Sequence, residues 1–372
     1  MKKTIIIFCV LFAFQLTAFA QPEVNCKSAV LMEQSTGKVL FEQNSHEPYP
    51  PASVTKIMTM LLVMEAVDGG NLKMDDIVTA SERAKSMGGS TIFLDAGEQM
   101  SVYDLMKGIA VASGNDACVA IGEHIAGSEA GFVDMMNNRA KELGMNNTQF
   151  INTNGLDDDN HLTSAYDIAL MSRELLKHEK IFEFTTIWTD NLRNGAFDLA
   201  NTNKLVRFYE GTNGLKTGST SKAGFCISAT AKRNNMQLIA VIMGSENSNI
   251  RFASAKSMLD YGFANYSIVM PAEDCKIDQS VKVKKGISDI VMPDIKAGFQ
   301  ALVEKSRKND VESNIELINE VTAPIKRGDE LGKIIFMLDG KSIGECKLIA
   351  RNDVARKTLF EVYSDLFSQW IR

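Results

Sequence analysis

The amino-acid sequence predicts an α+β protein in which helices lie between strands from both ends of one large domain, followed by a smaller, mainly β domain. Two observations predict this arrangement. Helical patterns occupy the middle of residues 21–270, while strand patterns lie near both ends of that segment. After Met270-Pro271, short strand-like pieces separated by turns replace the long apolar helices. A chain of 372 residues is long enough for two cores.

The first twenty residues predict an export signal that is removed from the mature protein. Lys2 and Lys3 form a positive head, residues 5–14 are apolar throughout, and Ala18-Phe19-Ala20 is a small-x-small cleavage site. The apolar run is shorter than the roughly 20 residues that a membrane-spanning helix needs. We therefore expect four parts, which are a signal peptide (1–20), the larger domain (21–270), a β-rich C-terminal domain (271–355) and an amphipathic terminal helix (356–372).

The larger domain is predicted to open with two strands and one buried helix. Residues 28–33 and 38–42 read as strands joined by a loop that contains Gly37. Residues 53–67 carry apolar side chains on nearly every helical face, which is typical of a helix that is buried on all sides. The sequence Asp68-Gly69-Gly70 ends this helix.

Further capping and turn signals define the remaining elements. Ser101 and Asp104 resemble a capping box that starts a helix toward Ala112, and Ser113-Gly114-Asn115 interrupts it. Thr163 or Ser164 caps another helix. The other expected elements are a helix over 116–124, the capped helix over 166–176, a strand pair over 223–231 and 236–243, and C-terminal strands over 281–285, 334–338 and 346–350.

Charge and cysteine content exclude several classes of protein. The formal net charge is −6, and it becomes more negative when the signal and its two lysines are removed, so nucleic acid is not an expected partner. The mature cysteines include no C-x-x-C pair, which argues against a metal site or a disulfide scaffold, and we expect no cofactor. Cys275 and Cys346 could form a disulfide, or the cysteines could pack as small apolar side chains.

Ser53 and Lys56 are the first candidates for chemistry. Residues three apart share one face of a helix, so the hydroxyl and the amine lie within reach of each other. A serine is a weak nucleophile until a base takes its proton, and burial makes a lysine such a base by disfavouring the ammonium. The alternative is that Ser53 only caps the helix while Lys56 extends to the surface.

Two further motifs complete a known set. Ser113-Gly114-Asn115 lies at a helix break and Lys216-Thr217-Gly218 at a strand, which gives S-x-x-K, S-x-N and K-T-G in the order of penicillin-recognising serine enzymes. Residues 52–59, 88–90, 112–117, 154–156 and 213–224 resemble the low-molecular-mass penicillin-binding proteins, the D-alanyl-D-alanine carboxypeptidases. The resemblance covers almost the whole mature chain and implies a penicillin-binding/β-lactamase-like transpeptidase fold, with antiparallel sheet and flanking helices.

The resemblance also implies a role for each matched residue. Ser53 attacks a D-alanyl-D-alanine carbonyl, Lys56 takes its proton, Ser113 relays a proton to the departing D-alanine, and Asn115 orients the substrate amide or Lys56. Substrate binding falls to Lys216, Thr217, Gly218, Ser219 and Arg251, with the N–H groups of Ser53 and Ser219 as the oxyanion hole. The implied partners are peptidoglycan stem peptides and inhibitory β-lactams, at the outer face of the bacterial cytoplasmic membrane.

Several alternatives stay open at this point. His161 could form a serine-histidine triad, but it lies in a polar loop, and we expect it to be structural. A β-lactamase would need a further base, for which Glu142 is the nearest fit, and a non-catalytic scaffold would not need the motifs. Gly88-Gly89 either borders the site or only connects two elements. The terminal helix is expected to lie on a membrane surface through its aromatic face, or else to pack on the protein itself.

Overall fold

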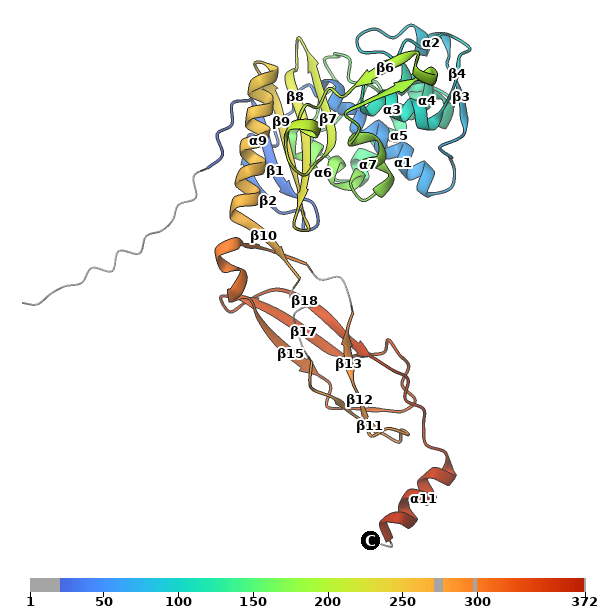
Figure 1. Ribbon diagram of the computed structural model, residues 1–372, viewed down its shortest axis with the longest axis vertical. Coiled ribbons are helices and arrows are strands. Elements are labelled where there is room, and N and C mark those ends of the chain that lie inside the picture. Colours follow the sequence, from blue (N-terminus) through green and yellow to red (C-terminus); the bar gives the residue numbers. More distant parts are fainter. Residues whose placement is uncertain (1–20, 271–276, 297–299, 371–372) are drawn as a thin grey trace, which may run out of the picture.

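The computed structural model describes residues 21–270, 277–296 and 300–370. The molecule is elongated, with the larger domain at one end, the C-terminal β domain next to it and the helix α11 at the other end (Figure 1). The predicted signal peptide and Cys275 lie outside the described residues, so neither the signal nor the Cys275–Cys346 pairing is tested. Of the other cysteines, Cys118 and Cys226 are buried in the larger domain.

A five-stranded antiparallel sheet organises the larger domain. Its order is β2-β1-β9-β8-β7, so strands from the start of the domain pair with a strand near its end. The strands are β1 (Ser28–Glu33), β2 (Val39–Gln43), β7 (Thr212–Thr220), β8 (Gly224–Arg233) and β9 (Met236–Ser245). The turn between β8 and β9 uses Asn234 and Asn235 at positive φ, as a tight hairpin requires. The sequence prediction of a sheet built from both ends is confirmed.

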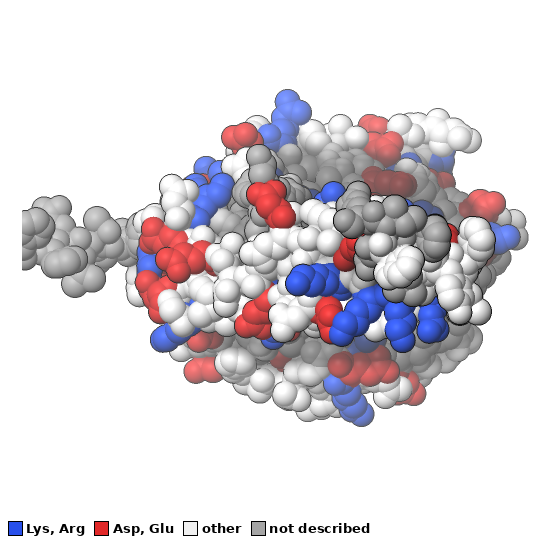
Figure 2. Space-filling model, turned by 90° about the horizontal axis from the view of Figure 1, so that it is seen from below, with Lys and Arg blue, Asp and Glu red and all other residues white. Residues whose placement is uncertain are grey.

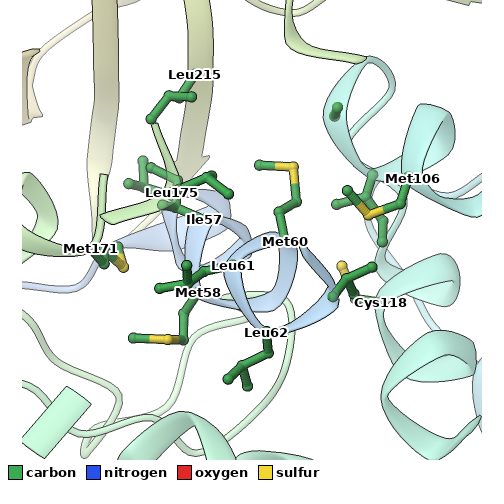
Figure 3. Packing of buried hydrophobic residues seen from close by; sticks show 14 of the residues in the cluster. Ile57, Met58, Met60, Leu61, Leu62, Met106, Cys118, Met171, Leu175 and Leu215 are labelled. Atoms are coloured by element: carbon green, nitrogen blue, oxygen red, sulfur yellow. The ribbon is translucent and has the colours of Figure 1, made fainter. Parts of the chain in front are cut away.

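Helix α1 (Lys56–Asp68) is the centre of the core. Its residues Lys56 to Met64 are all buried, which confirms the prediction of an enclosed helix. Figure 3 shows its apolar side chains surrounded by Met171 and Leu175 of α6 (Ala165–Leu175), Leu215 of β7, Met106 of α3 (Val102–Ala110) and Cys118 of α4 (Asn115–Ala126). A separate apolar cluster joins the opposite face of the sheet to α9 (Ser248–Asn265). The sheet is therefore covered by helices on both faces.

The remaining helices follow the predicted caps. Ser101 accepts a hydrogen bond from the Asp104 N–H (3.1 Å) at the start of α3, and Ser164 caps α6 through the Asp167 N–H (3.1 Å). Helices α3 and α4 are separated at Ser113, as predicted. The other elements of this domain are α2 (Glu82–Lys85), α5 (Glu129–Glu142), α7 (Phe182–Thr185), α8 (Leu205–Phe208), β3 (Ile77–Thr79), β4 (Gln99–Ser101), β5 (Thr189–Leu192) and β6 (Phe197–Ala200).

The C-terminal domain is mainly β, as predicted, but two of the strands expected to be short are longer, since β17 has nine residues and β18 has ten. One sheet has the order β13-β18-β17-β15, another β12-β11-β16, and β10 pairs with β14 next to the larger domain. The bounds are β10 (Tyr266–Val269), β11 (Val281–Lys284), β12 (Ile290–Val291), β13 (Pro293–Ile295), β14 (Ala301–Glu304), β15 (Glu312–Leu317), β16 (Glu320–Thr322), β17 (Glu330–Leu338) and β18 (Lys341–Ala350).

The terminal helix α11 (Leu359–Trp370) begins three residues later than the predicted residue 356, because residues 354–357 still pair with the β domain. Leu359, Phe360, Tyr363 and Trp370 are strongly exposed. The alternative prediction, that the apolar face of this helix packs on the protein itself, is therefore wrong for these four side chains. Among the described helices, none has the length and apolarity that crossing a membrane requires.

Candidate active site

Ser53 lies in a single 3₁₀ turn that leads into α1. The turn spans Ala52–Thr55, and Lys56 is the first residue of the α-helix, so the predicted helix starts with a tighter turn. Ala52 adopts a positive φ of 48°, a backbone conformation that is uncommon for a residue with a Cβ and often occurs at functional sites. The turn leaves Ser53 partly exposed, while its neighbours Ala52 and Val54 are buried.

The Lys56 amine is fully buried and has three oxygen neighbours. Its Nζ lies 2.9 Å from Ser53 Oγ, 2.7 Å from Asn115 Oδ1 and 2.6 Å from the Asn154 carbonyl oxygen. Asn115 Oδ1 and the Asn154 carbonyl only accept hydrogen bonds, so they occupy two N–H donors. The third direction points at a hydroxyl that can itself donate. An ammonium can donate to all three oxygens, whereas an uncharged amine keeps the two bonds to Asn115 and Asn154 and turns its lone pair toward the Ser53 hydroxyl.

Burial lowers the pKa of Lys56 to about 8, although the Asp116 carboxylate acts in the opposite direction. The same cause lowers the pKa of Lys216 well below its usual value, and the nearby Lys56 charge lowers it further. The Lys56 ammonium disfavours a charged Lys216, because two like charges in a water-poor site repel each other. The charge of Lys216 therefore depends on what occupies the site, and its predicted role in substrate binding stays a prediction.

Ser113 and Asn115 come from the junction of α3 and α4. Ser113 has a φ of 66° and is almost fully buried, which marks the predicted break. Asn115 is the first residue of α4, and its Nδ2 donates to the Gly88 carbonyl (2.7 Å) while its backbone N–H donates to Ser90 (2.7 Å). The Gly88-Gly89 loop therefore borders the site and fixes the amide orientation of Asn115, and it is more than a plain connection.

Strand β7 forms the opposite wall and is an edge strand of the main sheet. Lys216 Nζ donates to the Thr217 carbonyl (3.0 Å), and Thr217 Oγ1 donates to Thr202 Oγ1 (2.7 Å). Lys216 and Thr217 are buried, whereas Ser219 is exposed. An edge strand has backbone groups that no neighbouring strand uses, so β7 can pair with an extended peptide.

Two glycines allow the close approach of these elements. A Cβ at Gly218 would lie 2.7 Å from the Ser53 backbone nitrogen, so only glycine lets β7 approach the serine turn this closely. At Gly155, where φ is +90°, a Cβ would lie 1.9 Å from the Ala52 carbonyl oxygen. The sequence analysis did not assign a role to Gly155 or to the Asn154 carbonyl. The sequence signal for both is that residues 154–156 resemble the carboxypeptidase family.

Arg251 lies on α9 and is nearly fully buried. Its Nη1 donates to the carbonyls of Gly218 and Cys226 (both 3.2 Å), and its Nη2 donates to Ser248 Oγ (3.0 Å). Burial lowers the pKa of Arg251 to about 10. These contacts connect α9 to the end of β7, so the structure shows Arg251 as a support of the K-T-G strand. Its predicted contact with a substrate carboxylate stays a prediction.

His161 is a structural residue behind the serine turn. Its Nδ1 accepts the Ile151 N–H (3.0 Å), so its Nε2 carries the proton and faces Thr55 Oγ1 (2.8 Å). Thr55 Oγ1 in turn donates to the Ala52 carbonyl (2.8 Å). Burial lowers the pKa of His161 to about 4, so the imidazole is neutral at physiological pH. This geometry agrees with the expected structural role and not with a triad.

Glu142, the candidate base of a β-lactamase, lies on the surface at the end of α5. Its carboxylate pairs with Arg139 (3.0 Å), and its side chain is 64% exposed. A deacylating base must lie beside the acyl-enzyme in a partly dry site. Glu142 lies on the surface instead, so it is not placed to act as the deacylating base of a β-lactamase.

The comparisons with known proteins agree with this geometry. The family model for D-alanyl-D-alanine carboxypeptidase matches residues 15–247, which is more than half of the chain. The chain belongs to the D-alanyl-D-alanine carboxypeptidase family. A second model, the C-terminal domain of penicillin-binding protein 5, matches residues 270–356. The two matches leave residues 248–269 between them.

Individual relatives match between about two thirds and all of the chain. D-alanyl-D-alanine carboxypeptidase DacF of Bacillus subtilis is 43% identical and covers 100% of this chain and 98% of its own length. The crystal structure of penicillin-binding protein 5 from Haemophilus influenzae has 32% identity and a TM-score of 0.74, covering 91% of this chain and 99% of its own. Penicillin-binding protein D2 from Listeria monocytogenes, in an ampicillin-bound form, has 32% identity and a TM-score of 0.59, covering 64% and 98%.

Family membership establishes the coarse function. The chain is a serine-type D-alanyl-D-alanine carboxypeptidase of the penicillin-binding class, which acts on peptidoglycan in the cell envelope. The predicted fold is also confirmed, since solved penicillin-binding proteins share it over nearly the whole chain. A catalytically silent scaffold is not supported, because Ser53, Lys56 and Asn115 are assembled in one hydrogen-bonded cluster.

Proposed function

We propose that the chain removes the terminal D-alanine from peptidoglycan stem peptides through an acyl-enzyme on Ser53. The proposal rests on the 2.9 Å contact between Ser53 Oγ and the Lys56 amine. Hydrogen bonds to Asn115 Oδ1 and to the Asn154 carbonyl oxygen hold this amine in place. This geometry gives the hydroxyl a base at hydrogen-bonding distance and keeps that base in one orientation. Both groups are needed, because neither is reactive alone near neutral pH.

The proposed reaction has two steps. In the first, Ser53 Oγ attacks the carbonyl of the penultimate D-alanine, Lys56 takes the hydroxyl proton, and the C–N bond to the last D-alanine breaks. The leaving amine takes a proton, which Ser113 relays from Lys56. In the second, water adds to the ester, its proton passes back through the same groups, and Ser53 leaves. The products are the shortened peptide and free D-alanine, and the enzyme returns to its starting state.

Substrate binding is assigned to β7. We assign the free carboxylate of the substrate to the Lys216 amine and the Thr217 hydroxyl. The negative charge of that carboxylate would raise the lowered pKa of Lys216 and so favour the ammonium. The N–H groups of Ser53 and Ser219 are proposed as the oxyanion hole, which typically contributes about 3 to 4 kcal/mol per donor to the transition state. The close fit of Gly218 against the Ser53 nitrogen supports this pairing.

We also propose that the enzyme is attached to the outer face of the cytoplasmic membrane. The proposal combines the predicted signal peptide over 1–20 with α11, whose described apolar side chains are exposed. An interfacial helix needs an apolar face of moderate length and does not have to span the bilayer. The proposed boundaries are those of the sequence analysis, with a catalytic domain over 21–270, a β domain over 271–355 and a terminal helix over 356–372.

One experiment tests the catalytic proposal. The purified mature protein is incubated with a fluorescent penicillin and, separately, with a peptide that ends in D-Ala-D-Ala, alongside Ser53→Ala and the surface control Ser306→Ala. We expect stable labelling and D-alanine release by the wild type and by the Ser306 control, and neither by Ser53→Ala. Rapid turnover of the penicillin without stable label, or undiminished labelling of Ser53→Ala, would reject the proposal.

A further inference from the structure

The end of the β domain that faces away from the catalytic domain carries an excess of positive charge. We call it the distal end and define it as residues 282–290, 320–329 and 351–357. These segments contain eight lysines or arginines and four carboxylates, in a chain whose formal net charge is −6. The cations are Lys282, Lys284, Lys285, Lys326, Arg327, Arg351, Arg356 and Lys357.

Backbone hydrogen bonds hold the three segments of the distal end together. The Ile287 N–H donates to the Ala355 carbonyl (2.9 Å), and the Lys357 N–H donates to the Lys285 carbonyl (2.8 Å). The Arg327 N–H donates to an oxygen of the Asp353 carboxylate (2.6 Å). Cations that are 75 residues apart in sequence, from 282 to 357, therefore lie on one surface.

The position of this surface follows from strand β17. The nine-residue strand runs roughly 30 Å from Glu330, the residue that follows the distal segment 320–329, to Leu338. The next residue, Asp339, pairs with Arg307, whose 3₁₀ segment (Lys305–Asp310) contacts the catalytic domain through a bond from Lys305 Nζ to the Phe263 carbonyl (2.6 Å). Helix α11 starts directly after the distal end, on the same side of the molecule (Figure 1).

Most of the cations are free to meet an external anion. Of the four carboxylates, Glu320 pairs with Lys284, Asp289 lies 3.9 Å from Lys357, and Asp329 and Asp353 accept backbone N–H groups. Within the part of the chain that the structure describes, six exposed cations have no ion-pair partner, namely Lys282, Lys285, Lys326, Arg327, Arg351 and Arg356. The end-on view in Figure 2 shows lysine and arginine side chains gathered on this face.

Exposed apolar side chains lie among these charges. Ile287, in the segment between β11 and β12, is 57% exposed, and Ile290, the first residue of β12, is 48% exposed. A single exposed isoleucine is ordinary on a protein surface. Two exposed isoleucines within a basic surface, next to a helix with exposed aromatic rings, are typical of a protein surface that binds at a membrane interface.

We infer that the distal end binds the headgroups of anionic lipids directly, with Ile287 entering the headgroup layer and the lysines and arginines contacting lipid phosphates. The inference rests on the proposed interfacial placement of α11 and deepens it. Because α11 carries the acidic Glu361 and no lysine or arginine within Leu359–Trp370, the helix supplies apolar burial and the distal end supplies the electrostatic attraction. Stable attachment commonly needs two such signals.

The test uses the full mature protein and sedimentation with lipid vesicles. The quadruple variant Lys282→Gln/Lys285→Gln/Lys326→Gln/Arg327→Gln is compared with the control Lys38→Gln/Lys73→Gln/Lys141→Gln/Lys180→Gln, which removes the same charge from the catalytic domain. Each cation near an anionic surface contributes about fivefold to binding. On vesicles containing anionic phosphatidylglycerol, we expect the distal variant to bind on the order of several hundred-fold more weakly. The control variant should bind like the wild type, and raising the salt concentration should remove the difference.

Two contrary outcomes and two controls complete the test. Equal binding of the distal and control variants would overturn the inference. So would a distal variant that loses binding to soluble polyphosphate but keeps its vesicle binding, because the surface would then serve an anionic polymer. A separate variant with serine at Leu359, Phe360, Tyr363 and Trp370 tests α11 alone. D-alanine release from a soluble peptide should be unchanged in every variant, so a failure of catalysis is recognised independently of membrane binding.

Discussion

The burial of His161 makes a quantitative prediction about acid stability. The imidazole is neutral in the folded protein with a pKa of about 4, against an ordinary value of 6.5. The unfolded chain therefore binds more protons than the folded one below pH 6.5. The stabilisation is fully present above pH 6.5 and is lost as the pH falls through the folded pKa. The full difference is about 3 kcal/mol, most of which, about 2.5 kcal/mol, is lost by pH 4.5.

The assay is urea unfolding of the wild type and of His161→Gln at pH 7.5 and pH 4.5, both in a Trp370→Phe background. The chain has two tryptophans, so Trp188 then reports the catalytic domain alone. The free-energy difference between wild type and variant should shrink by about 2.5 kcal/mol between the two pH values. The variant also loses the hydrogen bond to Thr55, but this loss is the same at both pH values and cancels when the two free-energy differences are subtracted.

Penicillin acylation measured on the same two proteins separates this role from a triad. We expect His161→Gln to retain acylation within about tenfold, whereas the loss of a general base costs roughly 100- to 10,000-fold. A pH-independent difference in stability, or a loss of acylation in the second range, would refute the structural role of His161.

Two other substitutions test the geometry around Lys56. In Asn115→Asp, a carboxylate replaces the amide oxygen 2.7 Å from Nζ and stabilises the ammonium, so the midpoint of acylation against pH should rise from near 8 by at least about one unit. An unshifted midpoint would show that this contact does not set the charge of Lys56. Gly155→Ala should reduce acylation by at least about 100-fold, because the new Cβ displaces the Ala52 carbonyl. The control Gly144→Ala has a similar φ of +75° with open space around it, so its acylation should be unchanged, and equal loss in both would refute the steric argument.

The sequence predicted the chemistry of the site better than its surroundings. Ser53, Lys56 and Asn115 could be assigned because a nucleophile, its base and an amide have side-chain identities that recur at fixed spacing. The Asn154 carbonyl could not, since every residue carries a carbonyl and only the fold brings this one, 98 residues away, to the Lys56 amine. Local capping signals located the break at Ser113 because they depend on neighbouring residues alone.

Burial and surface charge were harder to predict for the same physical reason. The pKa of Lys216 is lowered mainly by burial, and the elements that bury it come from distant parts of the chain, so the residues near Lys216 in sequence do not predict it. Arg251 has the expected residue type at the expected position, yet its guanidinium contacts backbone carbonyls at the end of β7. The cations of the distal end are scattered along the chain and become one surface only through long-range strand pairing.

The most direct test of the account is a titration of the Lys56 amine. Protein carrying ¹³C at the lysine Cε is followed by NMR between pH 6 and 11, with Lys56→Arg and Lys216→Arg variants to assign the two buried signals. We expect a Lys56 midpoint near pH 8, with acylation of Ser53 rising over the same range. A midpoint above about 10, as for a lysine in water, would contradict the claim that an uncharged Lys56 activates Ser53.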